Sequence, residues 1–356
     1  MKKTITALSL SLIAFAAGVP SHAQDVSWKT LNDEVFLLHK QGQYDRAIVV
    51  AQKALQIAEQ TEGPNKPNVA TSLNNIGELY KIKGQYAQAE SFYKRSLAIR
   101  EKILGSDHPQ VAMSLNNLAD MYKIQGQYMQ AETLFKRSQA IFEKALGPDD
   151  PYLATSLNNL AELYNTQGHF VQAEPLFKRA LAILEKSLGP DHPDVAVSLN
   201  NLASLYNYQK QYTQAEQLFK RSLMIREKAL GPDHPEVAQG LNNLASVYLS
   251  QEQYTHVEIL LKRALAIREK SFGPDHPEVA ESLNNLAWLY YIQEKYSQAE
   301  PLYKRSLAIR EKALGPDHPA VAQILINMAQ LYKKTGQEKT AEEIEMRATV
   351  IRSIKR

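Results

Sequence analysis

Two residue types that bind metals and transfer protons recur at regular spacing along the chain. A turn of sequence Gly-Pro-Asp-His-Pro begins at Gly189, Gly231, Gly273 and Gly315, with variants at Gly105 and Gly147. Imidazole and carboxylate groups that meet at one centre can bind zinc or act as general acid and base. Whether these groups meet depends on the elements that carry them.

The spacing of the turns argues against a shared metal ion. The turns repeat every 42 residues, so equivalent histidines belong to successive units, and packed helices lie about 10 Å apart. Zinc requires its ligands at about 2 Å, which the four histidines cannot provide together (His192, His234, His276 and His318). We predict no metal site. Instead, we interpret the turns as helix caps, in which Asp233 caps the next helix and Glu236 completes a capping box.

The remaining chemistry-bearing residues do not form a known catalytic arrangement. The chain has no cysteine, which excludes disulfides, thiolate metal sites and a catalytic thiol. We find neither a Ser/His/Asp constellation nor a glycine-rich phosphate loop. Lys-Arg pairs such as Lys136-Arg137 suit a solvated helix face better than a phosphate-binding stripe. We therefore predict a protein that is not an enzyme and has neither catalytic residues nor a cofactor.

The first residues have the pattern of an export signal. Lys2 and Lys3 precede an apolar segment from Ile5 to Val19, and Ser21-His22-Ala23 resembles a cleavage site. We predict a signal peptide over residues 1–23 and a bacterial protein exported to the periplasm or secreted. The apolar segment is shorter than a bilayer span, and we expect no membrane span after cleavage. Without Lys2 and Lys3, 39 basic residues face 38 acidic ones, which does not support a nucleic-acid partner.

A five-residue motif fixes the architecture. The sequence Leu-Asn-Asn-Leu-Ala begins at Leu115 and returns every 42 residues, with weaker copies near both ends and no insertion between them. A constant period of this length is typical of a solenoid, whose units bury their apolar faces only by stacking. We predict one elongated all-α domain over residues 24–356. Its units lie near 28–66, 67–108, 109–150, 151–192, 193–234, 235–276, 277–318 and 319–356.

One unit contains two amphipathic helices. Val111, Leu115 and Leu118 follow helical spacing and predict a helix from about 109 to 125. Gly126 suits the left-handed residue after that helix, and a second helix is predicted from about 129 to 145. Later units depart from this pattern, since the turn glycine and two inward positions are replaced, and we expect the superhelix to deviate there (Lys210, Glu252, Glu294, Val257 and Leu261).

These residues resemble the tetratricopeptide repeat. The resemblance rests on small residues at Ala119 and Ala131, aromatic residues at Tyr122 and Phe135, and the turn glycine. The 42-residue form is similar to the repeat of kinesin light chains. The resemblance implies a right-handed superhelical solenoid of about eight antiparallel helix pairs, whose first helices line a concave groove. A kinesin role is not implied, because a heptad coiled-coil region is missing from the sequence.

The groove side of the first helices carries the candidate binding residues. One asparagine per unit is expected there: Asn75, Asn117, Asn159, Asn201, Asn243, Asn285 and Asn327. Asparagine amides both donate and accept, so they could hold a peptide backbone, as the resemblance implies, or bond between neighbouring units. We also place Lys81 and Lys123 in the early groove and Leu249, Trp288 and Tyr291 in the late groove. Trp288 is either a binding anchor or a contact with the next unit.

These features favour a non-enzymatic scaffold that binds peptide segments or helices of a protein partner in its groove. Two alternatives remain open from the sequence. One is an assembly or chaperone-like subunit of an envelope or secreted complex, and the other is a secreted effector. The sequence does not identify the partner.

Overall fold

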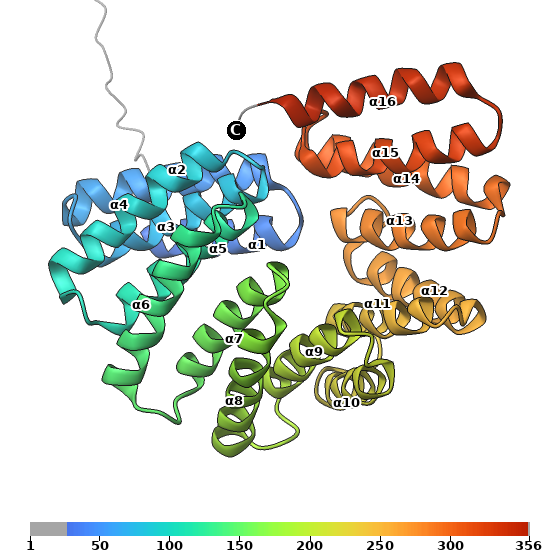
Figure 1. The fold of residues 1–356 in the computed structure, drawn as a ribbon. Helices are drawn as coiled ribbons and strands as arrows, with labels where there is room; N and C mark the ends of the chain where they lie inside the picture. Colours follow the sequence, from blue (N-terminus) through green and yellow to red (C-terminus); the bar gives the residue numbers. More distant parts are fainter. Residues whose placement is uncertain (1–26, 355–356) are drawn as a thin grey trace, which may run out of the picture.

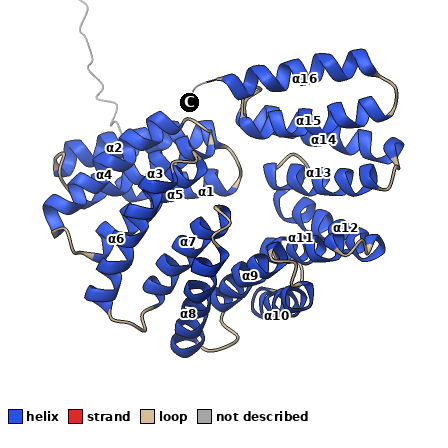
Figure 2. Cartoon of the chain, in the orientation of Figure 1, coloured by secondary structure: helices blue, strands red, loops and turns tan. Residues whose placement is uncertain are grey.

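The computed structural model describes residues 27–354, which form sixteen α-helices and no strand; Figure 2 shows the helices joined by short loops. We call the first helix of each pair the A helix: α1 (Trp28–Lys40), α3 (Pro67–Ile82), α5 (Pro109–Ile124), α7 (Pro151–Thr166), α9 (Pro193–Tyr208), α11 (Pro235–Ser250), α13 (Pro277–Ile292) and α15 (Pro319–Lys334). The second is the B helix: α2 (Tyr44–Glu62), α4 (Tyr86–Leu104), α6 (Tyr128–Leu146), α8 (Phe170–Leu188), α10 (Tyr212–Leu230), α12 (Tyr254–Phe272), α14 (Tyr296–Leu314) and α16 (Glu338–Ser353). The predicted signal peptide lies outside the described residues.

The helix pairs stack in sequence order into a strongly curved solenoid (Figure 1). Each A helix packs on its own B helix, and each B helix packs on the next A helix. A helices of successive units also touch one another, as α5 touches α7. The A helices lie on the inner side of the curve in Figure 1 and the B helices on its outer side. The prediction of an all-α solenoid of helix pairs is confirmed.

The core of a helix pair places a small residue of the A helix next to an aromatic ring of the B helix. Ala119 and Phe135 are both fully buried, because the alanine lets the two helices of the pair approach the ring closely. The same contact is visible in unit 2, where a Cβ on Gly77 would lie 2.9 Å from the Tyr93 ring. The aromatic position is occupied by the smaller Leu261 in unit 6, which is also buried.

The three units without a turn glycine keep the same turn. Gly126 has a φ of 73°, and Lys210, Glu252 and Glu294 have φ angles of 60°, 59° and 59°. Residues with a side chain rarely adopt this left-handed conformation. The neighbouring helices therefore impose the turn in these units, and the replacement residues carry its backbone strain.

Histidine caps five of the A helices (α5, α9, α11, α13 and α15), so our interpretation of Asp233 was wrong, whereas Asp150 caps α7. The Nδ1 of His234 accepts a hydrogen bond from the backbone N–H of Glu236 at 3.2 Å. The proline that follows occupies the first helical position, so the residue directly before it becomes the N-cap. Asp233 instead forms an exposed ion pair with Lys270 of α12, the B helix of the following unit, at 2.5 Å.

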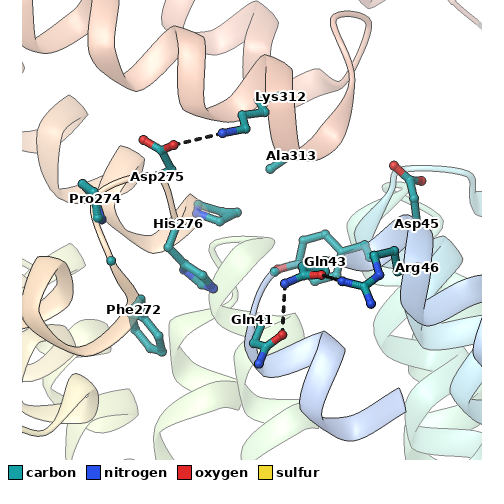
Figure 3. A pocket seen from close by; sticks show the side chains of 14 residues that line it. Gln41, Gln43, Asp45, Arg46, Phe272, Pro274, Asp275, His276, Lys312 and Ala313 are labelled. Atoms are coloured by element: carbon teal, nitrogen blue, oxygen red, sulfur yellow. Dashed lines mark hydrogen bonds and ion pairs between the residues drawn. The ribbon is translucent and has the colours of Figure 1, made fainter. Parts of the chain in front are cut away.

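The curvature brings the two ends of the solenoid into contact along a line that we call the seam. In the seam, the turns after α1 and α3 meet the turns before α13 and α15. His318 donates through Nε2 to the carbonyl of Ile82 at 3.1 Å. A Cβ on Gly42 would lie 3.1 Å from Nε2 of His276. Figure 3 shows the hollow beside this contact, between Gln41–Arg46 and Phe272–Pro277. The solenoid thus returns to its first units after about one superhelical turn.

Candidate functional site

The row of asparagines lies on the inner surface, as the sequence predicted for their side of the helix. All seven are neither fully buried nor fully exposed. Six of them are the second asparagine of the motif, with the first asparagine one residue earlier on the same helix, and in the last unit Ile326 precedes Asn327. Within residues 27–354, the hydrogen-bond partners of these first and second asparagines differ from one unit to the next.

Four members of the row bond to the preceding unit. The amide Nδ2 donates to the Oδ1 of the first asparagine one unit back: Asn75 to Asn32 at 2.8 Å, Asn117 to Asn74 at 2.9 Å, Asn243 to Asn200 at 2.6 Å and Asn327 to Asn284 at 3.0 Å. Such a bond fixes the spacing of neighbouring A helices. In the described residues, no such bond is found for Asn159, Asn201 and Asn285. The row therefore contains members that hold the solenoid together and members that are free for another partner.

The early groove carries a ladder of alternating charges. Lys81 bonds to Glu78 and Asp120, and Lys123 bonds to Asp120 and Glu162, all at 2.9–3.0 Å. Burial alone would raise the pKa of Asp120, but the charges of Lys81 and Lys123 outweigh it and keep that pKa below its usual value. The two lysines selected from the sequence are thus already neutralised by carboxylates of their own unit and of the next one.

The late groove contains a hollow of about 540 Å³ that we call the late-groove pocket. Leu249 of α11, Trp288 of α13 and Leu261 of α12 contribute apolar walls, and Asn285 and Asn327 lie at its lining. Tyr291 is not part of the lining, but its ring stacks on Trp288 with centroids 5.2 Å apart. The pocket therefore combines two of the residues predicted for the late groove, Leu249 and Trp288, with two members of the asparagine row.

A second hollow lies two units earlier, at the equivalent place on the inner surface. This mid-groove pocket of about 550 Å³ is lined by Asn201 and Asn243 of the row. It carries Asn165, Phe177 and Ser204 where the late-groove pocket carries Leu249, Leu261 and Trp288. The mid-groove pocket is therefore more polar, and an aromatic ring occupies the place of Leu261. The structure does not bring Asn75, Asn117 and Asn159 into either pocket.

Sequence reasoning missed one residue of the late-groove pocket, Asn242. Its side chain lines the pocket, is 9% exposed, and both its amide atoms are without a hydrogen-bond partner in the described structure. The equivalent Asn158 of unit 4 bonds to Ser198 at 3.3 Å. The first asparagine was visible in the sequence, but only the structure shows that both amide atoms of Asn242 are buried without a partner, whereas in the equivalent Asn116 this holds for Oδ1 alone.

The other chemistry considered from the sequence takes structural roles in the described residues. No group of three or more His, Asp or Glu side chains there could hold a metal ion. In the pair Lys136-Arg137, the lysine bonds to Glu132 at 2.7 Å and the arginine to Glu101 of the preceding unit at 2.6 Å. The basic side chains of this helix face therefore form ion pairs within the chain. No helix of residues 27–354 is long and apolar enough to cross a membrane.

The repeats also match a family model, the tetratricopeptide repeat. The matches cover residues 29–102, 79–128, 110–186, 170–228, 194–270, 258–312 and 293–352. The chain belongs to the tetratricopeptide repeat family. This assignment agrees with the helix pairs and with the small and aromatic core positions. A tetratricopeptide repeat match by itself shows no enzymatic family, and a search of curated proteins finds no match.

Several solved structures are similar to this tetratricopeptide repeat protein. A Podosopora anserina protein described as a kinesin light chain is 29% identical, with a TM-score of 0.47 over 58% of this chain and 97% of that one. BtubC (BKLC) from P. vanneervenii is 24% identical, with a TM-score of 0.51 over 66% and 91%. The Rap conjugation gene regulator of plasmid pLS20, in complex with the Phr* peptide, is 16% identical, with a TM-score of 0.60 over 91% and 93%. The likeness to the last two concerns the fold alone.

Proposed function

We propose that the protein is a non-enzymatic scaffold that binds peptide segments or short helices of a partner protein in its concave groove. The observation that supports this most directly is the pair of pockets on the inner surface. Each is lined by A helices of three successive units and by asparagine side chains. Concave sites with apolar walls and a few polar groups are the usual form of binding sites.

The chemistry of the pockets suits a peptide. An amide side chain pairs with the N–H and C=O groups of a peptide backbone whatever its sequence, and Asn201 and Asn285 have no partner in the described structure that would compete. A peptide is also bound in the Rap regulator of similar fold. That likeness is support at the level of fold, since function depends on the site and not on the fold.

The proposal is tested with a partner captured from the source cells by the purified protein and identified by mass spectrometry. A segment of that partner is then titrated against the protein and the variant Trp288→Ala. Loss of an anchor should weaken binding by about 2 kcal/mol, or roughly 30-fold. Val171→Ala, at a residue 89% exposed on α8, is the matched control and should bind normally. Unaltered affinity of Trp288→Ala would place the partner outside the late groove.

We further propose that the protein is a bacterial one exported to the periplasm or secreted. The support is the basic start, apolar segment and small-residue site within residues 1–23. N-terminal sequencing of protein from the envelope or culture medium should then begin at Gln24. An intact Met1 in those fractions would contradict cleavage. Captured partners that are unfolded subunits would favour the chaperone-like alternative over a stable scaffold.

A further inference from the structure

We propose that the late-groove pocket binds one aromatic side chain within an uncharged stretch of an extended peptide, and that Asn242 bonds the backbone of that peptide. This inference rests on the peptide-binding function proposed above and names the chemistry of its ligand. Three independent features carry it: a missing ring, a lining without charge, and a buried amide without a partner.

The first feature is a substitution in the core beneath the pocket. Five units place a buried aromatic ring at one position of the B helix: Tyr93, Phe135, Phe177, Phe219 and Tyr303. In unit 6, this position is Leu261, whose smaller side chain lines the pocket. Trp288 is part of the same lining. A ring supplied by a ligand would restore the aromatic contact that the other units make within the chain.

The second feature is the chemistry of the lining. None of the described residues that line this pocket is charged, and its apolar walls include Ala245, Val257 and Leu289. The mid-groove pocket, in contrast, includes Glu162, and the early groove carries the charge ladder. A charged ligand group would lose its hydration in the late-groove pocket without gaining a partner. The flanking residues of the ligand should therefore be uncharged.

The third feature is Asn242. Its Nδ2 and Oδ1 are shielded from water and lack a partner, although burying a polar group unpaired is unfavourable. The next member of the row, Asn285, does not bond to it, whereas Asn243 and Asn327 do bond to their counterparts. The Asn285 side chain is thus free to rotate away from Asn242 when a peptide binds. A peptide that inserts a side chain brings its own C=O and N–H to the same place, and these match the donor and acceptor of the amide.

The test uses a displayed library of random dodecapeptides selected on the purified protein. We expect enriched peptides to share one aromatic residue flanked by residues other than Asp, Glu, Lys and Arg. The best peptide should lose at least tenfold in affinity when its aromatic residue is replaced by alanine. It should lose as much against the variant Leu261→Phe, which restores the ring found in other units. Ile259→Phe adds the same ring on α12 at a residue that is 63% exposed, and it should bind normally.

A second variant probes the amide without filling the pocket. Asn242→Leu is close in shape and removes the unpaired polar atoms, so the protein should unfold at the same or a higher temperature while binding weakens. The outcomes separate the two proposals. If no peptide is enriched, the peptide-binding function fails. If enriched peptides carry charges, or bind Leu261→Phe and Asn242→Leu as tightly as the unaltered protein, peptide binding stands and our assignment of the pocket is overturned.

Discussion

Alanine substitutions at Asn243 and Asn285 should have opposite effects, although both residues hold the same position in successive units. Asn243 donates to Asn200 at 2.6 Å and accepts from Gln239 at 3.1 Å. The side chain of Asn285 makes no hydrogen bond in the described structure. Each lost bond between partly buried side chains costs about 0.5–1.5 kcal/mol. Asn243→Ala should therefore reduce the free energy of unfolding by roughly 1–3 kcal/mol, and Asn285→Ala should leave it within about 0.5 kcal/mol.

Urea unfolding followed by helical circular dichroism measures the stability difference. Because a solenoid can unfold in parts, hydrogen exchange should accompany it, and the loss in Asn243→Ala should be greatest in α9 and α11, the helices that the bond joins. The losses in peptide affinity should have the reverse order, with the larger loss in Asn285→Ala. Asn285→Ala should weaken a groove peptide by about tenfold, which corresponds to one lost hydrogen bond.

Equal destabilisation by the two substitutions would refute this reasoning, because it would mean that Asn285 also bonds within the chain. Unchanged stability in Asn243→Ala would show that the bond to Asn200 contributes nothing in water. The double variant supplies a further check. Since the two side chains share no partner, their effects on stability should add.

Three further predictions concern turns and caps. Lys210→Gly should raise stability by about 1 kcal/mol in thermal unfolding, because glycine adopts the φ of 60° without strain. His234→Ala should destabilise by about 0.5–2 kcal/mol through the lost cap, and Asp233→Ala, which breaks an exposed ion pair, should change the urea midpoint little. Burial, together with the nearby charges of Arg268 and His39, lowers the pKa of His276, and the backbone of Lys40 only partly opposes this. Because the unfolded chain then takes up the proton first, stability should fall as the pH drops below 6.5. His276→Asn, which retains a cap, should remove this dependence in unfolding measured across that range.

The sequence was sufficient for the fold because the period constrains every unit in the same way. The predicted helix from 109 to 125 ends within a residue of α5, and the second begins within a residue of α6. Propensity, apolar spacing and turn residues all favoured the same helix pair, and eight repetitions of one pattern remove most of the ambiguity that a single copy would leave. The replaced turn glycines were also visible, although only the structure shows that Lys210 keeps the turn.

The seam and the asparagine partners could not be predicted in this way. The contact of His318 with Ile82 depends on the curvature of the whole solenoid, which is the sum of small rotations between units. No local pattern encodes that sum. The bond from Asn243 to Asn200 and its absence at Asn285 depend on side-chain rotation within identical sequence motifs. The cap was misassigned for a simpler reason: the proline fixes the helix start one residue later than Asp233 would require.

Departures from the repeat pattern are concentrated in unit 6, and this has a consequence for dynamics. The unit has Leu261 in place of a ring, a strained turn at Glu252 and the unpaired amide of Asn242. Each of these departures removes a contribution to stability that other units retain. We therefore expect α11 and α12 to exchange amide hydrogens faster than α5 and α6, whose turn has Gly126. Binding sites commonly sacrifice local stability in this way. A bound peptide that fills the pocket should slow exchange in α11 and α12 selectively. Uniform exchange along the solenoid, with or without peptide, would mean that these departures are compensated within the unit and that the late groove is no softer than the rest.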